Sequence, residues 1–263
     1  MDLGLKGKVA LVAASSQGLG FAVAHELAAE GANLVMNARG EETLREAADA
    51  ITREYGTEVL AVAGDVSSPT DIQKIVSSGM EKFGRIDILV TNSGGPPAGR
   101  FEDLDAAKWD AAVSILLTSV VELTRLVLPG MKERRWGRIL NVTSIAAKQP
   151  VENLMLSNSL RAGVTGFSKT LAAEVAEFGI TVNTILPGYT ATERVEELAC
   201  HLANNEGLEA SDIKRRWEAE IPLGRLAEPR EFAAMAAFLV SERASYITGS
   251  SIAVDGGWIR SLF

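Results

Sequence analysis

Residues 8–20 read KVALVAASSQGLG, and this stretch decides the fold. Its first part is a nearly continuous apolar run, which is typical of a strand buried on both faces of a parallel sheet. Gly18 and Gly20 follow, and they allow the backbone to turn tightly and to begin a helix close to the strand. The free N–H groups and the positive dipole end of such a helix bind phosphate oxygens. The stretch therefore predicts a strand, a phosphate-binding turn and a helix.

Short apolar runs alternate with longer helical patterns along the rest of the chain. We expect strands at 8–13, 33–38, 59–63, 86–91, 137–142, 180–186 and 251–254, and helices at 18–30, 41–55, from Pro69 onward, 106–131, 156–178 and 229–240. Sustained alternation of this kind predicts a Rossmann-type, doubly wound α/β fold. We expect a mostly parallel seven-stranded sheet with helices on both faces. No repeat or flexible linker divides the chain, so residues 1–263 are predicted to form one dinucleotide-binding domain.

A helical segment at about 190–221 interrupts the alternation after the sixth predicted strand. Ligands of open α/β sheets bind beyond the carboxyl ends of the strands, which is where this segment would lie. We therefore interpret it as a lid on the substrate side. A plain surface excursion is the alternative interpretation.

Composition excludes several classes of function. The net charge is −8, with acids and bases scattered along the chain, which argues against nucleic acid or an anionic membrane as a partner. The single cysteine, Cys200, excludes an internal disulfide and a thiolate metal cluster, and the presence of only two histidines argues against a histidine-rich metal site. No apolar run approaches the ~20 residues of a membrane span, and the start of the chain does not resemble a signal peptide. We expect a cytoplasmic protein with a small-molecule substrate and no metal.

Further motifs occur in a fixed order along the chain. Residues 13–20 are similar to Thr-Gly-x-x-x-Gly-x-Gly, with Ala13 and Ala14 in the first two places, and residues 91–94 (TNSG) are similar to Asn-Asn-Ala-Gly. Asp65-Val66, Pro187-Gly188 and the motifs PLGR at 222–225 and VDGG at 254–257 complete the set. On these motifs the chain resembles the short-chain dehydrogenase/reductase family over residues 7–258. The resemblance, with the charge at the end of the second strand, implies cofactor contacts from Ser15, Ser16, Gln17, Gly18, Leu19, Gly20, Arg39, Asp65, Val66, Asn92, Ser93, Gly94, Pro187, Gly188 and Thr192.

Ala14 departs from the family pattern, because glycine normally occupies its place in the turn. Alanine is tolerated there if the backbone φ is negative. If φ is positive, the turn is strained or shifted, and cofactor affinity would suffer.

The end of the second predicted strand indicates which nicotinamide cofactor binds. An acid there would bond the ribose 2′-OH and repel a 2′-phosphate, but the chain instead continues with Arg39 and Gly40. The guanidinium of Arg39 can pair with a 2′-phosphate, although Gln17 stands where many NADP-using relatives have a second base. We favour NADP(H) over NAD(H). A solvated surface arginine is the alternative.

The reaction centre departs furthest from the family. The family's serine, tyrosine and lysine align with Ser144, Ser157 and Arg161, and its asparagine aligns with Leu116. An aliphatic hydroxyl is a far weaker acid than a phenol, and arginine stays protonated. Arg161 can still bond the nicotinamide ribose and stabilise charge on a carbonyl oxygen, and Ser144 can donate a second hydrogen bond. We take Ser144, Ser157 and Arg161 as the candidate catalytic residues, with helix capping and packing as the alternative for the last two.

Other residues are candidates to replace the missing proton donor. Tyr189 follows the sixth strand, and Lys148, Glu152 and Asn153 lie in the loop between Ser144 and Ser157. For Tyr189 we favour a packing or rim role, because only the analogy of fold places it near the nicotinamide.

Three functions remain open. The first is an NADP(H)-dependent oxidoreductase acting on a small carbonyl or alcohol, such as a 3-oxoacyl compound, sugar or ketone. The alternative is a catalytically silent nucleotide-binding relative, acting as a sensor or partner subunit. A third is isomerisation or elimination without net hydride consumption. The resemblance also implies a homotetramer, with a dimer possible, and apolar stretches at 104–131, 156–178 and 258–263 agree with an interface.

Overall fold

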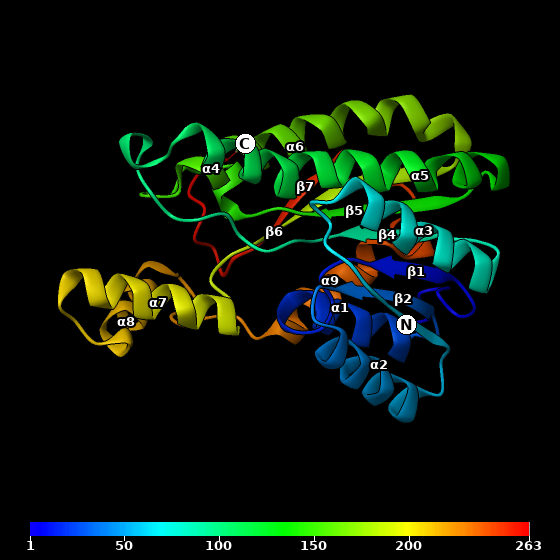
Figure 1. Cartoon of the computed structure of the whole chain (residues 1–263), viewed down its shortest axis with the longest axis horizontal. Helices are drawn as coiled ribbons and strands as arrows, with labels where there is room; N and C mark the ends of the chain where they lie inside the picture. Colours follow the sequence, from blue (N-terminus) through cyan, green and yellow to red (C-terminus); the bar gives the residue numbers. More distant parts are fainter. Residues whose placement is uncertain (263) are drawn as a thin grey trace.

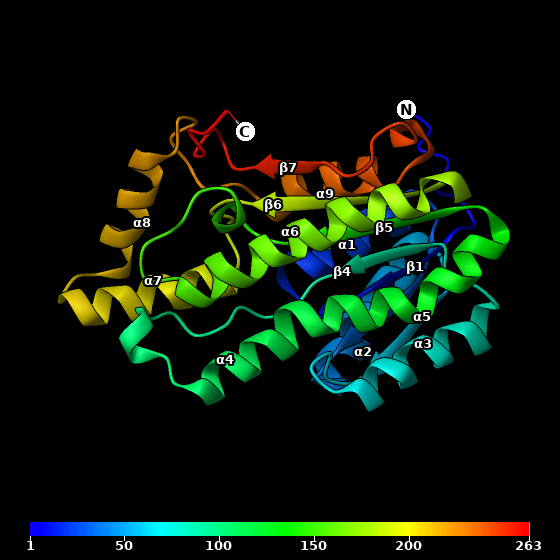
Figure 2. The same cartoon turned by 90° about the horizontal axis from the view of Figure 1, so that it is seen from above.

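The computed structural model describes residues 1–262, apart from the side chain of Asn205. Seven parallel strands form one sheet in the order β3-β2-β1-β4-β5-β6-β7 (Figures 1 and 2). They are β1 (Val9–Val12), β2 (Asn33–Ala38), β3 (Val59–Ala63), β4 (Ile88–Thr91), β5 (Gly137–Val142), β6 (Ile180–Pro187) and β7 (Ser251–Val254). The strand order reverses between β1 and β4, which flank the point where ligands bind in doubly wound sheets. The predicted Rossmann-type fold is confirmed, and the sheet is entirely parallel.

Helices cover both faces of the sheet. One face carries α1 (Gly18–Ala29), α2 (Glu41–Tyr55) and α9 (Pro229–Leu239), and the other carries α3 (Pro69–Phe83), α5 (Ser119–Arg134) and α6 (Met155–Val175). Their apolar residues form two large buried clusters, one on each side. Because every inner strand is covered twice, the strands read as apolar runs without alternation.

Three predicted elements differ from the observed ones. β4 begins at Ile88, and the buried Asp87 before it accepts a hydrogen bond from the Val9 amide through its carboxylate. The helix predicted at 106–131 consists of α4 (Ala106–Val113), a π-helical turn (Ser114–Thr118) and α5. The end of the helix predicted at 156–178 is a 3₁₀ turn, Ala176–Phe178. The other boundaries agree with the sequence to within a residue or two.

The segment after β6 folds as two helices, α7 (Glu193–Glu206) and α8 (Ala210–Glu220). They pack on each other through Ala199, Ala203, Ile213 and Trp217. Figures 1 and 2 show this pair standing beyond the carboxyl ends of the strands. Its position is the one expected for a segment that covers a ligand.

One helical stretch of the described residues, Ala106–Arg134, is long and apolar enough by composition to cross a membrane. The apolar runs of the sequence had predicted no membrane span. Leu123, Val127 and Met131 from this stretch belong to a buried cluster of the sheet. Packing as a core helix therefore accounts for its apolar character.

Candidate active site

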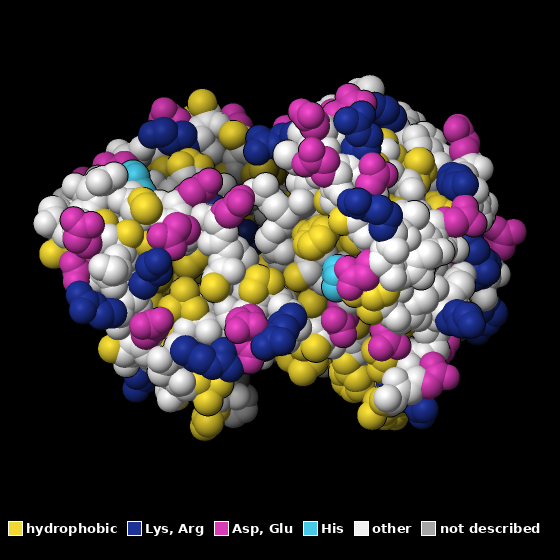
Figure 3. All heavy atoms as spheres, turned by 90° about the horizontal axis from the view of Figure 1, so that it is seen from below, with side chains coloured by type: hydrophobic (Ala, Val, Ile, Leu, Met, Phe, Trp, Pro, Cys, Tyr) yellow, Lys and Arg dark blue, Asp and Glu magenta, His cyan; other side chains and the backbone are white. Residues whose placement is uncertain are grey.

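The residues predicted to bind the cofactor follow the carboxyl ends of β1, β2, β3, β4 and β6. On the face shown in Figure 3 the surface is hollowed between the part formed by α7 and α8 and the part formed by α1 and α2. Acidic and basic side chains are interspersed on both sides of this hollow. The glycine-rich turn forms one wall, and the start of α7 lies opposite to it.

The glycine-rich turn depends on close backbone approach. Gly18 has a φ of +58°, and a Cβ added at Gly20 would lie 2.0 Å from the carbonyl oxygen of Ala14. Ala14 itself has a φ of 49°, in the left-handed region that L-residues rarely adopt. The second of the two possibilities set out from the sequence therefore holds, and this alanine is strained. The side-chain amide of Asn92 donates to the Ala14 oxygen at 3.3 Å and ties β4 to the turn.

The start of α1 is free to bind an anion. Gln17 precedes the helix, is exposed and makes no side-chain capping bond, and the first turn contains no acid. The N–H groups of this turn are thus available to phosphate oxygens. Below it the buried Ser15 donates to the Val12 carbonyl oxygen at 2.8 Å and accepts from the Asn37 amide at 3.1 Å. These bonds hold the turn against β2.

Arg39 and Asp65 lie together at the adenine end of the predicted site. Arg39 is exposed directly after β2. Hydrogen bonds from the amide and hydroxyl of Ser67 hold the pKa of the Asp65 carboxyl below its usual value, and the charge of Arg39 lowers it further. The neighbouring Val66 is buried. This arrangement leaves the Arg39 guanidinium at the surface beside the end of β2.

Gly188 and Thr192, which are also predicted to bind the cofactor, lie in the segment between β6 and α7. The Gly188 amide donates to Val254 at 2.9 Å, and a Cβ at Gly188 would lie 2.7 Å from the Cα of Asp255, so only glycine fits there. The hydroxyl of Thr192 caps α7 by accepting from the Val195 amide. Thr192 also lies close to Gly18, which brings the starts of α7 and α1 together. Ser93 and Gly94 continue from Asn92 in the loop after β4.

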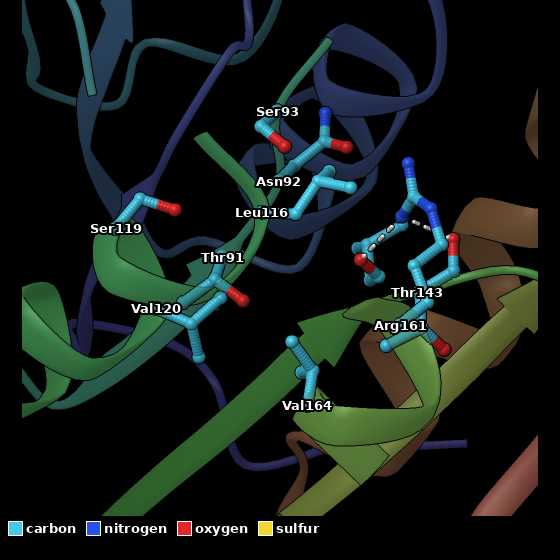
Figure 4. Close-up of a pocket in the computed structure, with 10 residues that line it drawn as sticks. Thr91, Asn92, Ser93, Leu116, Ser119, Val120, Thr143, Arg161 and Val164 are labelled. Atoms are coloured by element: carbon cyan, nitrogen blue, oxygen red, sulfur yellow. Dashed lines mark hydrogen bonds between the residues drawn. The ribbon is translucent and has the colours of Figure 1, made fainter. Parts of the chain in front are cut away.

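Arg161 lies in a small cavity formed by the ends of β4 and β5, the π-helical turn and α6 (Figure 4). Its Nε donates to the buried Ser157 Oγ at 3.1 Å, and its Nη1 donates to the carbonyl oxygens of Val142 and Thr143 at 3.3 and 2.7 Å. Figure 4 shows the remaining nitrogen pointing away from these carbonyls. Burial lowers the pKa of Arg161 to about 10, and the charge of Arg194 contributes to the lowering. The group is still charged at neutral pH.

Ser144 has a hydrogen-bond partner of its own. Its Oγ accepts a hydrogen bond from the Ala146 amide at 3.1 Å and caps the short helix Ile145–Ala147. No hydrogen bond of the described chain joins it to Ser157 or Arg161. Its own hydroxyl hydrogen remains available to donate. The structure therefore joins Ser157 and Arg161 by a hydrogen bond, and Ser144 directly follows Thr143, whose carbonyl oxygen accepts from Arg161.

Leu116 occupies the place of the family's asparagine with an apolar contact. It lies in the π-helical turn, is 3% exposed and packs with Leu156 and Leu160 of α6. Figure 4 shows it across the cavity from Arg161. Beneath, Thr91 donates to Asn141 at 2.7 Å and Asn141 donates to Ser168 at 2.8 Å. These buried bonds give the cavity a rigid floor.

The suggested replacements for the proton donor do not converge on Ser157. Tyr189 stacks on Trp217 at 4.7 Å and meets the edge of Trp258 at 6.2 Å. Burial raises the pKa of Tyr189 to about 12, which makes it a weaker acid than a free tyrosine. This placement agrees with a packing role for Tyr189.

The loop candidates are engaged elsewhere. Arg100 donates to the side chain of Asn153 at 3.1 Å and pairs with the exposed Glu152 at 3.5 Å. Lys148 is exposed. Over the part of the chain that the structure describes, no group of three or more His, Cys, Asp or Glu residues is arranged to hold a metal ion.

Arg194 is a residue of the cleft that the sequence motifs do not indicate. It lies in the first turn of α7, and its Nη2 donates to the Pro96 carbonyl oxygen at 3.5 Å. A basic residue between Glu193 and Glu196 at a helix start, where acids are favoured, is the signal that could have identified it.

Comparisons with known proteins agree with this geometry. A family model described as enoyl-(acyl carrier protein) reductase matches residues 13–259. A D-beta-hydroxybutyrate dehydrogenase from Cupriavidus necator is 37% identical over 97% of this chain and 99% of its own length, and a 3-oxoacyl-[acyl-carrier-protein] reductase from Vibrio cholerae is 36% identical over 97% and 98%. The crystal structure of L-sorbose reductase from Gluconobacter frateurii, complexed with NADPH and L-sorbose, is similar with a TM-score of 0.95 and 38% identity over 100% of both chains.

Proposed function

The chain belongs to the short-chain dehydrogenase/reductase family, and on that premise we propose that it is an NADP(H)-dependent oxidoreductase acting on a small carbonyl compound or alcohol. The observation that carries this proposal is the convergence of the glycine-rich turn, Asn92 and Thr192 on the edge of the sheet where Arg161 lies. Relatives named as a hydroxybutyrate dehydrogenase, an oxoacyl reductase and a sorbose reductase support the class of reaction. The free start of α1 fits a pyrophosphate, and the exposed Arg39 fits a 2′-phosphate.

In this proposal the nicotinamide supplies the hydride when bound. Ser157 and the two backbone carbonyls hold the guanidinium of Arg161 in one orientation. The charged group stabilises negative charge on the substrate oxygen, an effect of the kind that contributes about 10²–10³-fold in other enzymes. Arg161 keeps its proton at neutral pH, so water supplies the proton to the product oxygen. Ser144, which directly follows Thr143, donates a second hydrogen bond to that oxygen.

The apolar packing of Leu116 favours a second candidate, a nucleotide-binding relative without turnover. That position would otherwise offer a polar group to a proton relay. Single-turnover mixing of NADPH-loaded protein with a panel of ketones, oxo acids and ketoses separates the two candidates. Absence of NADPH oxidation with every compound, at intact cofactor binding, would support the silent relative.

The cofactor is tested by titrating the protein with NADPH and NADH and following ligand fluorescence. We expect NADPH to bind more tightly, and Arg39→Ala to weaken NADPH about tenfold or more with little effect on NADH, as expected for loss of a charged hydrogen bond. Arg45→Ala is the matched control, because Arg45 is exposed on the neighbouring helix α2. Tighter binding of NADH, or an Arg39→Ala variant that binds NADPH unchanged, would contradict the assignment.

We propose further that the chain is one dinucleotide-binding domain with residues 190–221 as a substrate-side lid, and that it assembles as a cytoplasmic homotetramer. The exposed Leu126 on α5 and the exposed Leu262 in the tail support an interface. Light scattering of the purified protein tests the assembly, and a monomeric mass would refute it.

A further inference from the structure

Arg194 spans the opening between α7 and the loop after β4. Besides its bond to Pro96, its guanidinium lies directly over Gly95, where an added Cβ would come within 3.3 Å of Nη2 and 3.4 Å of Nε. The backbone of Gly95 therefore permits the arginine to reach inward from the helix. This position lies on the β4 side of the cleft, whereas the free amides expected to hold a pyrophosphate lie at the start of α1.

The charges at this opening are poorly compensated. Among the described residues no carboxylate forms an ion pair with Arg161, for which the limit is 4.0 Å. The positive charge of Arg194 destabilises the charged form of Arg161. Within residues 1–262 the one ion pair of Arg194 is with Glu197 at 3.4 Å, and both side chains are mostly exposed, so this pair stabilises little. The first turn of a helix also disfavours a cation. An anion in the cleft would relieve these repulsions.

We propose that Arg194 and Arg161 together select carbonyl substrates that carry a carboxylate. In this arrangement Arg161 faces the carbonyl oxygen, and the planar guanidinium of Arg194 binds the carboxylate with two parallel hydrogen bonds. Glu197 is then a competitor that the substrate displaces. This inference rests on the proposed function, because the carbonyl must lie at the nicotinamide end of the cleft.

The test compares acids with their neutral esters on NADPH-loaded protein. Pyruvate, acetoacetate and levulinate vary the spacing between carbonyl and carboxylate, and each is titrated beside its methyl ester by calorimetry. We expect at least one acid to bind about tenfold or more tightly than its ester, the difference expected for a charged hydrogen-bonded pair. Arg194→Gln should abolish this preference and leave the NADPH affinity unchanged. Glu197→Gln should strengthen it, because the competing carboxylate is lost.

Arg216→Gln is the matched control. It removes the same charge from α8, where Arg216 pairs with Glu206 at the far end of α7, and it should leave the preference intact. Equal binding of acids and esters by the unaltered protein would overturn the inference. So would an Arg194→Gln variant that loses NADPH affinity, because Arg194 would then serve the pyrophosphate of the cofactor.

Failure of the proposed function has a different signature. If NADPH does not bind at all, the same acids and esters are titrated on the protein alone. If the protein alone prefers acids and Arg194→Gln removes this preference, the anion site at Arg194 stands and the oxidoreductase function is refuted. If the protein alone shows no preference, both proposals are refuted.

Discussion

The two ends of the cleft differ in what positions their chemistry. At the proposed cofactor end the available groups come largely from the backbone, through the free amides of α1 and the close approach of Gly20 to Ala14. At the reaction centre they come from side chains, and three of the four family positions hold Leu116, Ser157 and Arg161 instead. Backbone donors survive many substitutions, whereas a phenol or an amine is lost in a single one. The predicted binding geometry can therefore persist where the predicted catalytic side chains differ.

The largest expected effect comes from restoring the family's side chains at the reaction centre. Ser157→Tyr combined with Arg161→Lys supplies a phenol one helical turn from an amine. General acid catalysis typically contributes 10²–10⁴-fold, so we expect NADPH oxidation with the best substrate to accelerate by about 100-fold. Steady-state rates with a panel of ketones, oxo acids and ketoses measure it.

Ser159→Tyr is the control for this variant, because Ser159 is exposed on the same turn of α6 and its ring would point into solvent. It should leave the rate unchanged. A folded double variant, with an unaltered NADPH affinity and no gain in rate, would show that the cleft no longer presents a carbonyl to the nicotinamide. The protein would then bind the cofactor at one end of the cleft and use the reaction centre for another function.

The sequence predicted the strands well because burial on both faces leaves a direct trace in apolar runs. It also placed Asn92, Thr192 and Gly188 at one edge, because parallel strands end at the same side of a sheet. It could not predict the sign of φ at Ala14, which depends on how Asn92 and Gly20 pack around the turn. Nor could it predict the π-helical turn around Leu116.

The hydrogen-bond partners of the site's side chains could not be predicted from the sequence either, because they come from distant elements. The contact between Ser157 and Arg161 could be predicted, because the two residues are one helical turn apart. The carbonyl oxygens of Val142 and Thr143, in contrast, come from another element. Arg194 reaches Pro96 across almost a hundred residues of chain. Such contacts follow from the packing of the lid helices and have no local pattern.

Relief of strain at the cofactor end gives the next largest effect. A non-glycine residue in the left-handed region costs about 1–2 kcal/mol, and the added flexibility of glycine in the unfolded chain offsets part of the gain. Ala14→Gly should therefore raise the free energy of unfolding by about 1 kcal/mol and tighten NADPH binding several-fold. Urea unfolding and fluorescence titration measure the two quantities.

The neighbouring Ala13 provides the opposite control. It is fully buried at the end of β1 and is not among the residues with positive φ, so Ala13→Gly loses packing and should destabilise the protein. If Ala14→Gly also destabilised the protein, the turn would not be strained. The packing of the Ala14 side chain would then help to hold the turn in place.

The smallest expected effect concerns pH, because the rate of hydride transfer should not depend on it near neutrality. The pKa of Arg161 is lowered to about 10 and that of Tyr189 is raised to about 12, so both groups stay protonated between about pH 6 and pH 9. The rate of hydride transfer under single-turnover conditions should be flat over this range. It should fall only as the pH rises through the pKa of Arg161, because loss of that proton removes the charge that stabilises the substrate oxygen. The Ser157→Tyr and Arg161→Lys double variant, by contrast, should acquire a slope from its phenol. An inflection in the unaltered protein between pH 6 and pH 9 would mean that another side chain transfers the proton, and the reaction centre would then be less divergent than its aligned residues indicate.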